Sequence, residues 1–599
     1  MKEERKKTYS VMFVIFLFFL CFSLFVNIPA LQKNFLFADE AIYHAITQSL
    51  AQDGDLEYTK KDLYRYFQSF SSGPLGIFLK KGKDDKIFFA KSFAYPLFAA
   101  PFVKVFGSNG FFVFHSLLLL LLLLMGFRFV SLWERPSLSL VSILTFLFAS
   151  VAVAYFIWIS PDFFNLFLVF CVLFLWLFKL RYEEKIHEEK NNNKFKRFLL
   201  SDWTDYLACA LVGIAVFSKP PNVVLMGPLV LSALAKKKFL KTALMILTFL
   251  LISSLFWGTN YLVTGDWNYM GGERKTFMYH YPYEKEIATF DIYGYEMTSE
   301  GYGKKHLFPP KVFIYNIFYY FCGRFTGITW YFFPAFFFLI LFFFEKKRIY
   351  QWFILAALAG EILIYIILMP DNYAGGGGAL ANRYFLNIYP LFFFLPRQKM
   401  SFKKIGLCWI IASLFISQIL INSILYSHFP ATHAKKFPFK ILPVEMTLIN
   451  NIPTNTNPKA FRQEVGTPPN IGWLHFLDDN FHPREEPNGF WTRGQHTAEM
   501  ILKTYYPVEK LVFHLLNNPR IRNEIIVKVG REKKKIILGR HQRGTLEFIP
   551  GNGFQMKAAH LYRIKIKSSK GSIPYFENEK REEKRFLGVF FELEISPKQ

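Results

Sequence analysis

Cysteine is scarce in this chain of 599 residues, and the few cysteines present form no pattern. They are Cys21, Cys171, Cys209, Cys322 and Cys408. All five lie in or beside hydrophobic segments, and no two are closely spaced. The sequence therefore predicts neither a zinc site nor a disulfide framework.

Several motifs of soluble enzymes are also missing. The sequence contains no Walker A loop, no HExxH zinc motif and no dinucleotide-binding fingerprint, so ATP and nucleotide-sugar chemistry have no support. The first hydrophobic run, 8–31, is longer than a signal-peptide core and is not followed by a small-x-small cleavage site. We therefore expect it to remain as the first membrane span.

Hydrophobic residues are abundant, making up 52% of the chain, and 73 residues are phenylalanine. They arrive in long blocks, each close to the roughly 20 residues that a membrane helix needs. The sequence thus predicts a polytopic α-helical membrane protein with about eleven transmembrane helices. The expected spans are 9–31, 110–130, 137–158, 162–178, 203–218, 221–235, 240–263, 329–344, 350–369, 384–396 and 405–427.

The distribution of charge predicts how these spans are oriented. The chain carries a net charge of +26, but much of the excess lies beside the hydrophobic blocks, so nucleic acid is not an expected partner. Six short segments hold 24 Lys and Arg residues, whereas the alternate turns 155–162, 218–222 and 370–383 hold two. The positive-inside rule places the N-terminus in the cytoplasm and, with an odd number of spans, the C-terminal region outside.

Asp39 and Glu40 follow the first span directly. Two carboxylates so close to hydrocarbon are costly unless they face water, protein or substrate. Residues 41–50 are expected to form a short helix, and Asp39 would then lie at its N-terminus, where the helix dipole favours negative charge. Helix capping alone is the alternative explanation.

Other candidate residues lie in segments expected on the same external side. In the long loop 31–109, Lys91 begins an apolar stretch that ends at Phe102. Prolines make this stretch too irregular for a span. The stretch either lines a cavity in the membrane interface or is a plain connector. Asp162 is the ionised residue of a short turn, with capping as its alternative role. Lys219 is an external lysine, against the charge rule, and it either snorkels or binds an anion.

Two further external segments have functional character. The loop 265–311 is polar and aromatic, and its length is typical of a mobile lid. The glycine-rich segment 371–384 permits close backbone approach to a ligand and ends near Arg383, whose guanidinium suits a phosphate. A flexible linker with a snorkelling arginine is the alternative. Glu361 lies inside an expected span without an evident partner.

The composition changes after residue 427. Residues 428–490 are rich in proline and asparagine and are expected to form a linker. From 491 to 599, short strand patterns alternate with turn residues, which favours an external all-β sandwich domain. The expected strands are 511–517, 524–529, 534–539, 544–550, 560–568 and 586–595.

The order of these motifs resembles that of the bacterial membrane glycosyltransferases of the GT-C type, near the lipid A aminoarabinose, protein mannosyl and rhizobial lipopolysaccharide transferases. The resemblance covers residues 1–427 in outline, and 490–599 are similar to a β-sandwich tail that some such proteins carry. The matching pieces are Asp39-Glu40, the stretch Lys91–Pro101, Ser160-Pro161-Asp162, Ser218-Lys219-Pro220 and Ala381-Asn382-Arg383-Tyr384.

The resemblance implies an inverting glycosyltransferase of the bacterial inner membrane, with its β domain in the periplasm. The donor would be a polyprenyl-phosphate-linked sugar and the acceptor an envelope lipid, glycan or protein. Asp39 would be the general base with Glu40 as its neighbour, Lys91, Lys219 and Arg383 would bind the donor phosphate, and Asp162 would support them. A divalent metal is used by some relatives, but no ligand set is visible in this sequence.

Two other functions remain open at this stage. A lipid-linked glycan flippase or transporter also buries charges among many spans, although internal repeats, which would favour it, are not seen. A nonenzymatic envelope protein that binds glycan through its β domain is the second.

Overall fold

The computed structural model divides the chain into two compact units. Unit 1 comprises 1–304, 328–369 and 382–424, and unit 2 comprises 305–327, 370–381 and 425–599. The structure describes residues 2–31, 36–185, 194–282, 289–292, 294–296, 309–396, 400–453, 462–466, 468–469, 471–485, 488–577 and 582–598. Parts of the predicted loop 265–311 and of the predicted linker 428–490 lie outside these ranges.

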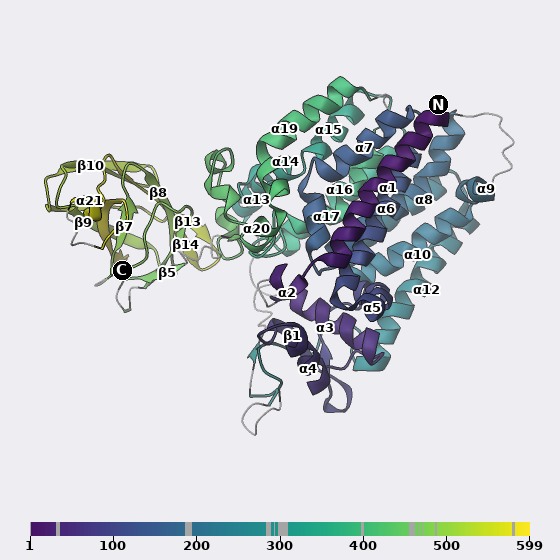
Figure 1. Ribbon diagram of the computed structural model, residues 1–599, viewed down its shortest axis with the longest axis horizontal. Helices are drawn as coiled ribbons and strands as arrows, with labels where there is room; N and C mark the ends of the chain where they lie inside the picture. The colour runs from purple at the N-terminus through teal and green to yellow at the C-terminus, as the bar shows by residue number, and fades with distance from the viewer. Residues whose placement is uncertain are drawn as a thin grey trace. The chain divides into compact units, whose positions relative to one another are not determined.

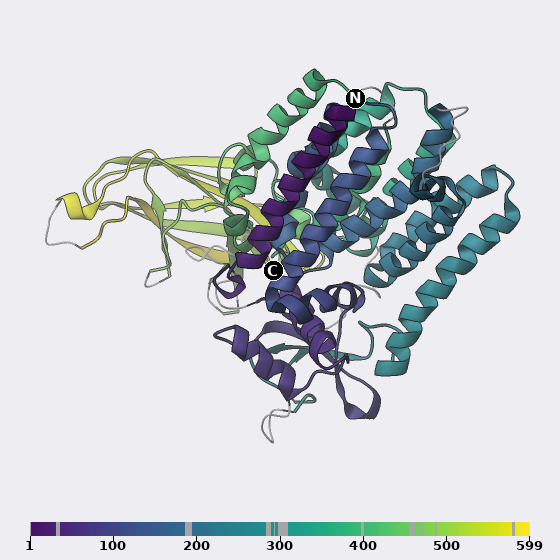
Figure 2. The ribbon, with the colours of Figure 1, turned by 45° about the vertical axis from the view of Figure 1, so that its right-hand side comes forward.

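Unit 1 is mainly helical, and its helices pack side by side in a bundle (Figure 2). They are α1 (Lys2–Phe25), α2 (Ile28–Leu31), α3 (Asp39–Gln52), α4 (Lys60–Ser69), α5 (Ala94–Phe106), α6 (Gly110–Val130), α7 (Pro136–Phe148), α8 (Asp162–Lys185), α9 (Lys194–Leu200), α10 (Trp203–Ser218), α11 (Met226–Ala235), α12 (Phe239–Thr264), α14 (Ile328–Tyr331), α15 (Phe333–Phe343), α16 (Ile349–Leu368), α17 (Arg383–Ile388), α18 (Pro390–Phe394), α19 (Phe402–Ile421) and α20 (Ser423–His428, which runs on into unit 2).

The apolar helices mark the chain as a membrane protein, but the prediction of eleven spans is wrong in number. Within the described residues, six helices are long and apolar enough to cross a membrane, or up to eight if each of two bent helix pairs forms one span. The six are Glu3–Phe25, Ala94–Val130, Asp162–Glu183, Phe239–Thr264, Ile349–Leu368 and Phe402–Ile421. The bent pairs turn by 68° between α7 and the 3-10 helix Val151–Ile157, and by 69° between α9 and α10.

The remaining predicted spans, 221–235, 329–344 and 384–396, are helical but too short. Proline explains their interruption: Pro220 and Pro221 begin a 3-10 turn before α11, Pro334 lies in the first turn of α15, and Pro390 begins α18 directly after α17. Proline lacks the N–H that a continuous helix requires.

Two segments predicted as external loops fold more regularly than expected. Parts of both loops form a small sheet, and the stretch after Lys91 forms a helix. The strand order is β2 (Ile87–Phe89), β1 (Leu75–Lys81), β3 (Glu273–Met278) and β4 (Tyr295–Glu296). Because β3 pairs with β1 along its length, this part of 265–311 is a sheet strand rather than a lid. The stretch after Lys91 is also regular, since α5 continues through Pro101 and packs against α3.

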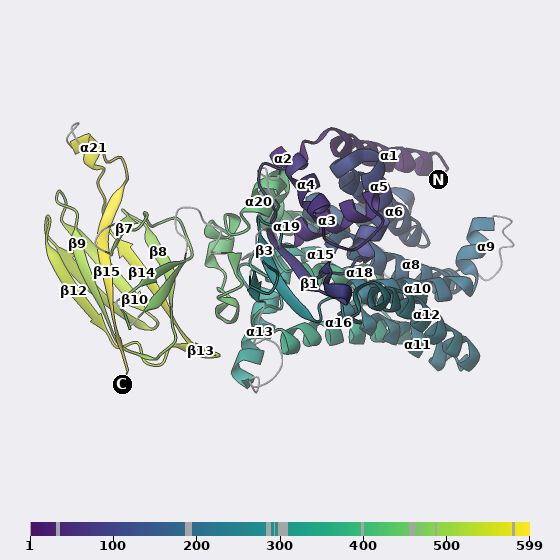
Figure 3. The same cartoon turned by 90° about the horizontal axis from the view of Figure 1, so that it is seen from below.

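Unit 2 contains two antiparallel sheets that share one hydrophobic core (Figure 3). The first sheet has the order β11 (Glu532–Leu538), β10 (Asn523–Val529), β14 (Ala559–Ser568), β8 (Thr497–Thr504), β6 (Gly472–Phe476) and β5 (Gln463–Val465), with β13 (Phe554–Met556) paired to β14. The second has the order β12 (Arg543–Phe548), β9 (Val508–Asn517), β15 (Leu587–Pro597) and β7 (Phe490–Arg493). Unit 2 also contains α13 (Pro310–Cys322) and α21 (Pro574–Glu577).

The prediction of a C-terminal β-sheet region is confirmed, and the six expected strands correspond to β9, β10, β11, β12, β14 and β15 within a few residues. Two strands, β5 and β6, lie inside the stretch 428–490, so the sheet begins earlier than expected. The proline-rich and asparagine-rich surroundings conceal these strands, which are only three and five residues long.

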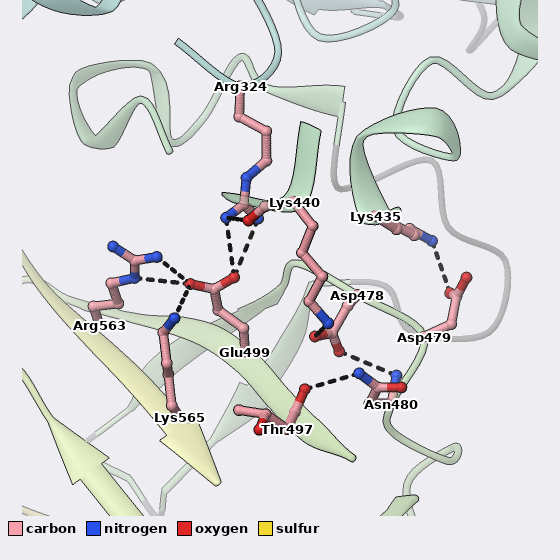
Figure 4. Close-up of polar contacts among 10 residues, drawn as sticks. All are labelled: Arg324, Lys435, Lys440, Asp478, Asp479, Asn480, Thr497, Glu499, Arg563 and Lys565. Atoms are coloured by element: carbon pink, nitrogen blue, oxygen red, sulfur yellow. Dashed lines mark hydrogen bonds and ion pairs between the residues drawn. The ribbon is translucent and has the colours of Figure 1, made fainter. Parts of the chain in front are cut away.

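A buried carboxylate attaches the segment that carries Arg324 to the sheet of unit 2 (Figure 4). Glu499, on the outer face of β8, is 2% exposed. One oxygen accepts hydrogen bonds from both terminal nitrogens of Arg324, at 3.1 Å each, and the other accepts one from Nε of Arg563 at 2.8 Å. Lys565 adds an ion pair at 3.2 Å. Burial raises the pKa of Glu499, but these cations outweigh it and hold the pKa at about 2.

The depressed pKa of Glu499 predicts an acid-dependent loss of stability. Because the folded-state pKa lies below the unfolded value, the stabilising contribution is complete above about pH 4.5 and disappears as the pH falls towards 2. The difference in pKa corresponds to roughly 3 kcal/mol. We expect the β-sheet signal of Glu499→Gln to melt at a lower temperature than that of the wild type at pH 6. At pH 3 this gap between the two melting temperatures should be smaller. Circular dichroism of the full chain measures this, and a gap of equal size at both pH values would contradict it.

Candidate active site

Asp39 is the first residue of α3, and it does not cap the helix. The N-cap position belongs to Ala38, whose φ of 48° lies in the region that favours glycine. Such a backbone costs on the order of 1–3 kcal/mol and tends to occur at functional sites. The alternative in which Asp39 serves only as a cap is therefore not supported.

The carboxylate of Asp39 bridges two cations from distant parts of unit 1. Oδ1 lies 2.7 Å from Nζ of Lys91, just before α5, and Oδ2 accepts a hydrogen bond of 2.7 Å from Arg383, the first residue of α17. Burial raises the pKa of Asp39, but the charges of Lys91 and Arg383 outweigh burial and hold it well below its usual range. Asp39 is thus a carboxylate neutralised from both sides.

A second ion pair adjoins the first. Asp162, at the start of α8, is 2.5 Å from Nζ of Lys219 and accepts a hydrogen bond of 2.9 Å from Ser160. Asp162 is also close enough to Arg383 for the two charges to interact. The structure therefore brings together Asp39, Lys91, Asp162, Lys219 and Arg383, which we call the ion cluster.

These residues come from element ends that share one side of unit 1. Figure 1 shows α3, α5 and β1 at the end of this unit away from the N-terminus. The ion cluster is partly buried: the side chains of Lys91, Lys219 and Arg383 are 16%, 12% and 17% exposed. A cluster with this degree of burial excludes much of the water and still leaves access for a ligand.

Arg274 is a further cation that the sequence did not single out as a site residue. It lies on β3, and its guanidinium carbon is 4.8 Å from the centre of the Phe78 ring, while Nζ of Lys91 is 5.0 Å from the same centre. Its charge interacts with Asp39 and Lys91. Only the long-range pairing of β1 with β3 brings Arg274 here, so no local signal could have identified it.

Two guanidinium groups keep an unused donor at this site. Nε of Arg383 and Nε of Arg274 are buried without a hydrogen-bond partner among the described residues. Buried donors are nearly always satisfied in folded proteins, so an exception calls for an explanation such as a ligand. Both donors belong to residues that suit phosphate oxygens.

Glu40 points to a different partner. One carboxylate oxygen accepts a hydrogen bond of 3.2 Å from the backbone N–H of Ile159. Ile159 directly precedes the turn that carries Ser160 and Asp162. Glu40 therefore helps to position this turn relative to α3.

Tyrosine rings surround the charged groups. Nζ of Lys219 and the guanidinium carbon of Arg383 lie 5.7 and 5.6 Å from the centre of the Tyr384 ring. This ring stacks on that of Tyr365, with the two ring centres 4.5 Å apart. Tyr43, one turn after Asp39, is buried; burial and the charge of Asp39 raise its pKa far above the ordinary value. Aromatic faces of this kind stabilise cations.

The donor set at the cluster does not fit a divalent metal. Asp39 and Asp162 are already neutralised by cations, and no group of three or more His, Cys, Asp or Glu residues that could hold a metal occurs in the part of the chain that the structure describes. The site has more cations than carboxylates: Lys91, Lys219, Arg274 and Arg383 against Asp39, Asp162 and Glu40. The excess positive charge favours an anionic ligand.

Comparisons with known proteins give little further guidance. No protein family model and no curated protein matches the sequence. Among solved structures, the chain is similar to the apo form of the oligosaccharyltransferase from Archaeoglobus fulgidus, with a TM-score of 0.38 and 12% identity. The similarity covers 70% of this chain and 56% of that protein, just over half its length. A TM-score of this size is too low to establish a shared fold.

Proposed function

We propose that the chain is a membrane glycosyltransferase that moves a sugar from a polyprenyl-phosphate donor to an envelope lipid, glycan or protein. The observation that carries the proposal is the bridging of Asp39 by Lys91 and Arg383. Two further cations lie beside them, and two guanidinium Nε donors of the site have no partner among the residues that the structure describes. In this proposal the general base and the phosphate-binding groups are in direct contact with each other. The positive-inside rule favours the non-cytoplasmic side of the membrane for the ion cluster, and the resemblance to bacterial GT-C transferases implies the inner membrane.

The reaction requires one displacement at the anomeric carbon. The acceptor oxygen forms a bond to this carbon while its proton passes to the carboxylate of Asp39. The bond from the carbon to the donor phosphate breaks, and the lipid phosphate leaves with the electron pair. Arg383, Lys91, Lys219 and Arg274 stabilise the charge that develops on it. A single displacement inverts the anomeric configuration.

The ion pairs also suggest an order of events. While Lys91 and Arg383 are bound to Asp39, its low pKa makes it a weak base. A donor phosphate competes for the same two cations and so weakens their hold on Asp39. The pKa of Asp39 then rises towards the range in which it accepts a proton effectively. We infer that the donor binds first and prepares the base.

The direct test is covalent transfer by the purified protein in detergent, where no compartments exist. A polyprenyl-phosphate sugar with a labelled sugar is mixed with an extract of envelope acceptors. We expect the label to appear in an acceptor and free polyprenyl phosphate to appear in equal amount. If the protein consumes no donor in detergent but moves intact donor across the membrane of liposomes, it is instead a flippase.

A further inference from the structure

A buried polar network lies beneath the ion cluster and connects two of its segments. Glu361, in the middle of α16, is 1% exposed, and Asn387 and Asn222 are fully buried. Nδ2 of Asn387 donates a hydrogen bond of 2.9 Å to Oε1 of Glu361 and a second one to Oδ1 of Asn222. Asn222 in turn donates to the carbonyl of Ala215 at 2.9 Å.

The spacing of these residues relates them to the cations above. Asn387 follows Arg383 by four residues, so both lie on the same face of α17. Asn222 follows Lys219 by three residues and belongs to the 3-10 turn Pro220–Leu225. A single amide group, that of Asn387, therefore links the segment carrying Arg383 to the segment carrying Lys219.

A third side chain reinforces the same layer. Asn165, one turn after Asp162 in α8, donates hydrogen bonds to the carbonyl of Pro161 at 2.7 Å and to Oγ of Ser218 at 2.8 Å. Ser218 directly precedes Lys219. The segments that hold Asp162, Lys219 and Arg383 are thus joined by buried amides below their charged ends.

We propose that Glu361 is a positioning residue that holds Lys219 and Arg383 in place through Asn387 and Asn222. A carboxyl group within an apolar helix is costly, and such residues generally serve a function. Glu361 orients the amide of Asn387 by accepting one of its two hydrogens, which leaves the other directed at Asn222. An acceptor oxygen at position 361 is what this role requires, whether or not it carries a charge.

The proposal is tested by the chemical reactivity of Lys219 in the full chain in detergent, without any ligand. A small amine-acylating reagent is applied, and mass spectrometry measures the rate at which each lysine is modified. In Glu361→Leu we expect Lys219 to react about 2- to 10-fold faster, the range that one hydrogen bond is worth. Glu361→Gln keeps an acceptor oxygen and should leave the rate close to that of the wild type.

Two controls separate positioning from general loosening. Lys179, buried at the other end of α8 and paired with Asp205, should stay slow in every variant. Asn387→Leu breaks the same link from its other side, so it should match Glu361→Leu, and the double variant should react no faster than either single one. Unchanged reactivity of Lys219 in both leucine variants, or equal acceleration in Glu361→Gln, would overturn the proposal.

The consequence for the donor rests on the function proposed above. If that function holds, the affinity for polyprenyl phosphate should fall in Glu361→Leu by a factor similar to the change in Lys219 reactivity, and Glu361→Gln should restore it. If Arg383→Ala itself leaves this affinity unchanged, the proposed function fails. The reactivity of Lys219 still decides the role of Glu361 in that case.

Discussion

Asp39→Asn is expected to lower the rate of sugar transfer by about 10²–10⁴-fold, the usual contribution of a general base. The asparagine side chain has nearly the same size, but its amide cannot accept the proton of the acceptor hydroxyl. The affinity for polyprenyl phosphate should stay the same or increase, because the carboxylate that competes for Lys91 and Arg383 is gone. A large loss in kcat without a loss in donor affinity is therefore the signature of this variant.

A matched control distinguishes catalysis from the loss of an ion pair. Asp266 pairs at 3.1 Å with the buried Lys80, which lies on β1 of the same unit. Asp266→Asn therefore also leaves a lysine without its carboxylate. Transfer by this variant should remain near that of the wild type. Glu40→Gln should be milder than Asp39→Asn, since its amide oxygen can still accept from Ile159. Near-normal turnover in Asp39→Asn would return Asp39 to a structural role.

Arg383→Ala is expected to weaken the binding of polyprenyl phosphate by at least about 30-fold, which corresponds to 2 kcal/mol or more for a buried charged contact. Arg383 provides a planar fork, and its buried Nε has no hydrogen-bond partner within the described part of the chain. Arg383→Lys keeps the charge but not the fork, so its loss of affinity should be smaller. Binding of a fluorescent polyprenyl phosphate to the purified variants measures all three affinities.

Arg65 supplies the control for this experiment. It is an arginine of α4 that pairs with two carboxylates, Asp53 and Asp62. Arg65→Ala should leave the affinity for polyprenyl phosphate unchanged. Equal affinity in wild type and Arg383→Ala would remove Arg383 from the phosphate site, and the same loss in Arg65→Ala would indicate an indirect effect.

The fold was predictable where local pattern decides the structure. The apolar blocks all became helices, and the alternating strands β9 to β12 were located within a few residues. β8 was not predicted, because its sequence 497–504 contains residues that favour helices, and only its place between β14 and β6 makes it a strand. The number of spans was overestimated because short apolar helices have the same composition as full spans.

The members of the ion cluster could be named from the sequence as candidates, but their contacts could not. The charge alternation predicts that Asp39, Lys91, Asp162, Lys219 and Arg383 lie on one side of the membrane, and in the structure they lie close together. No sequence rule indicated that Lys91 and Arg383, 292 residues apart in the numbering, share one carboxylate. Arg274 and the partner of Glu361 were missed for the same reason, since each depends on contacts between segments distant in the chain.

The most direct test of the ion cluster as a lipid-phosphate site compares two ligands that differ only in the phosphate. Polyprenyl phosphate and the corresponding polyprenol are titrated into the wild-type protein in the same detergent. We predict that the phosphate binds at least about 30-fold more tightly, equal to about 2 kcal/mol, and that Arg383→Ala abolishes most of this preference. Equal affinity of the wild-type protein for the phosphate and the alcohol would contradict the assignment of the cluster.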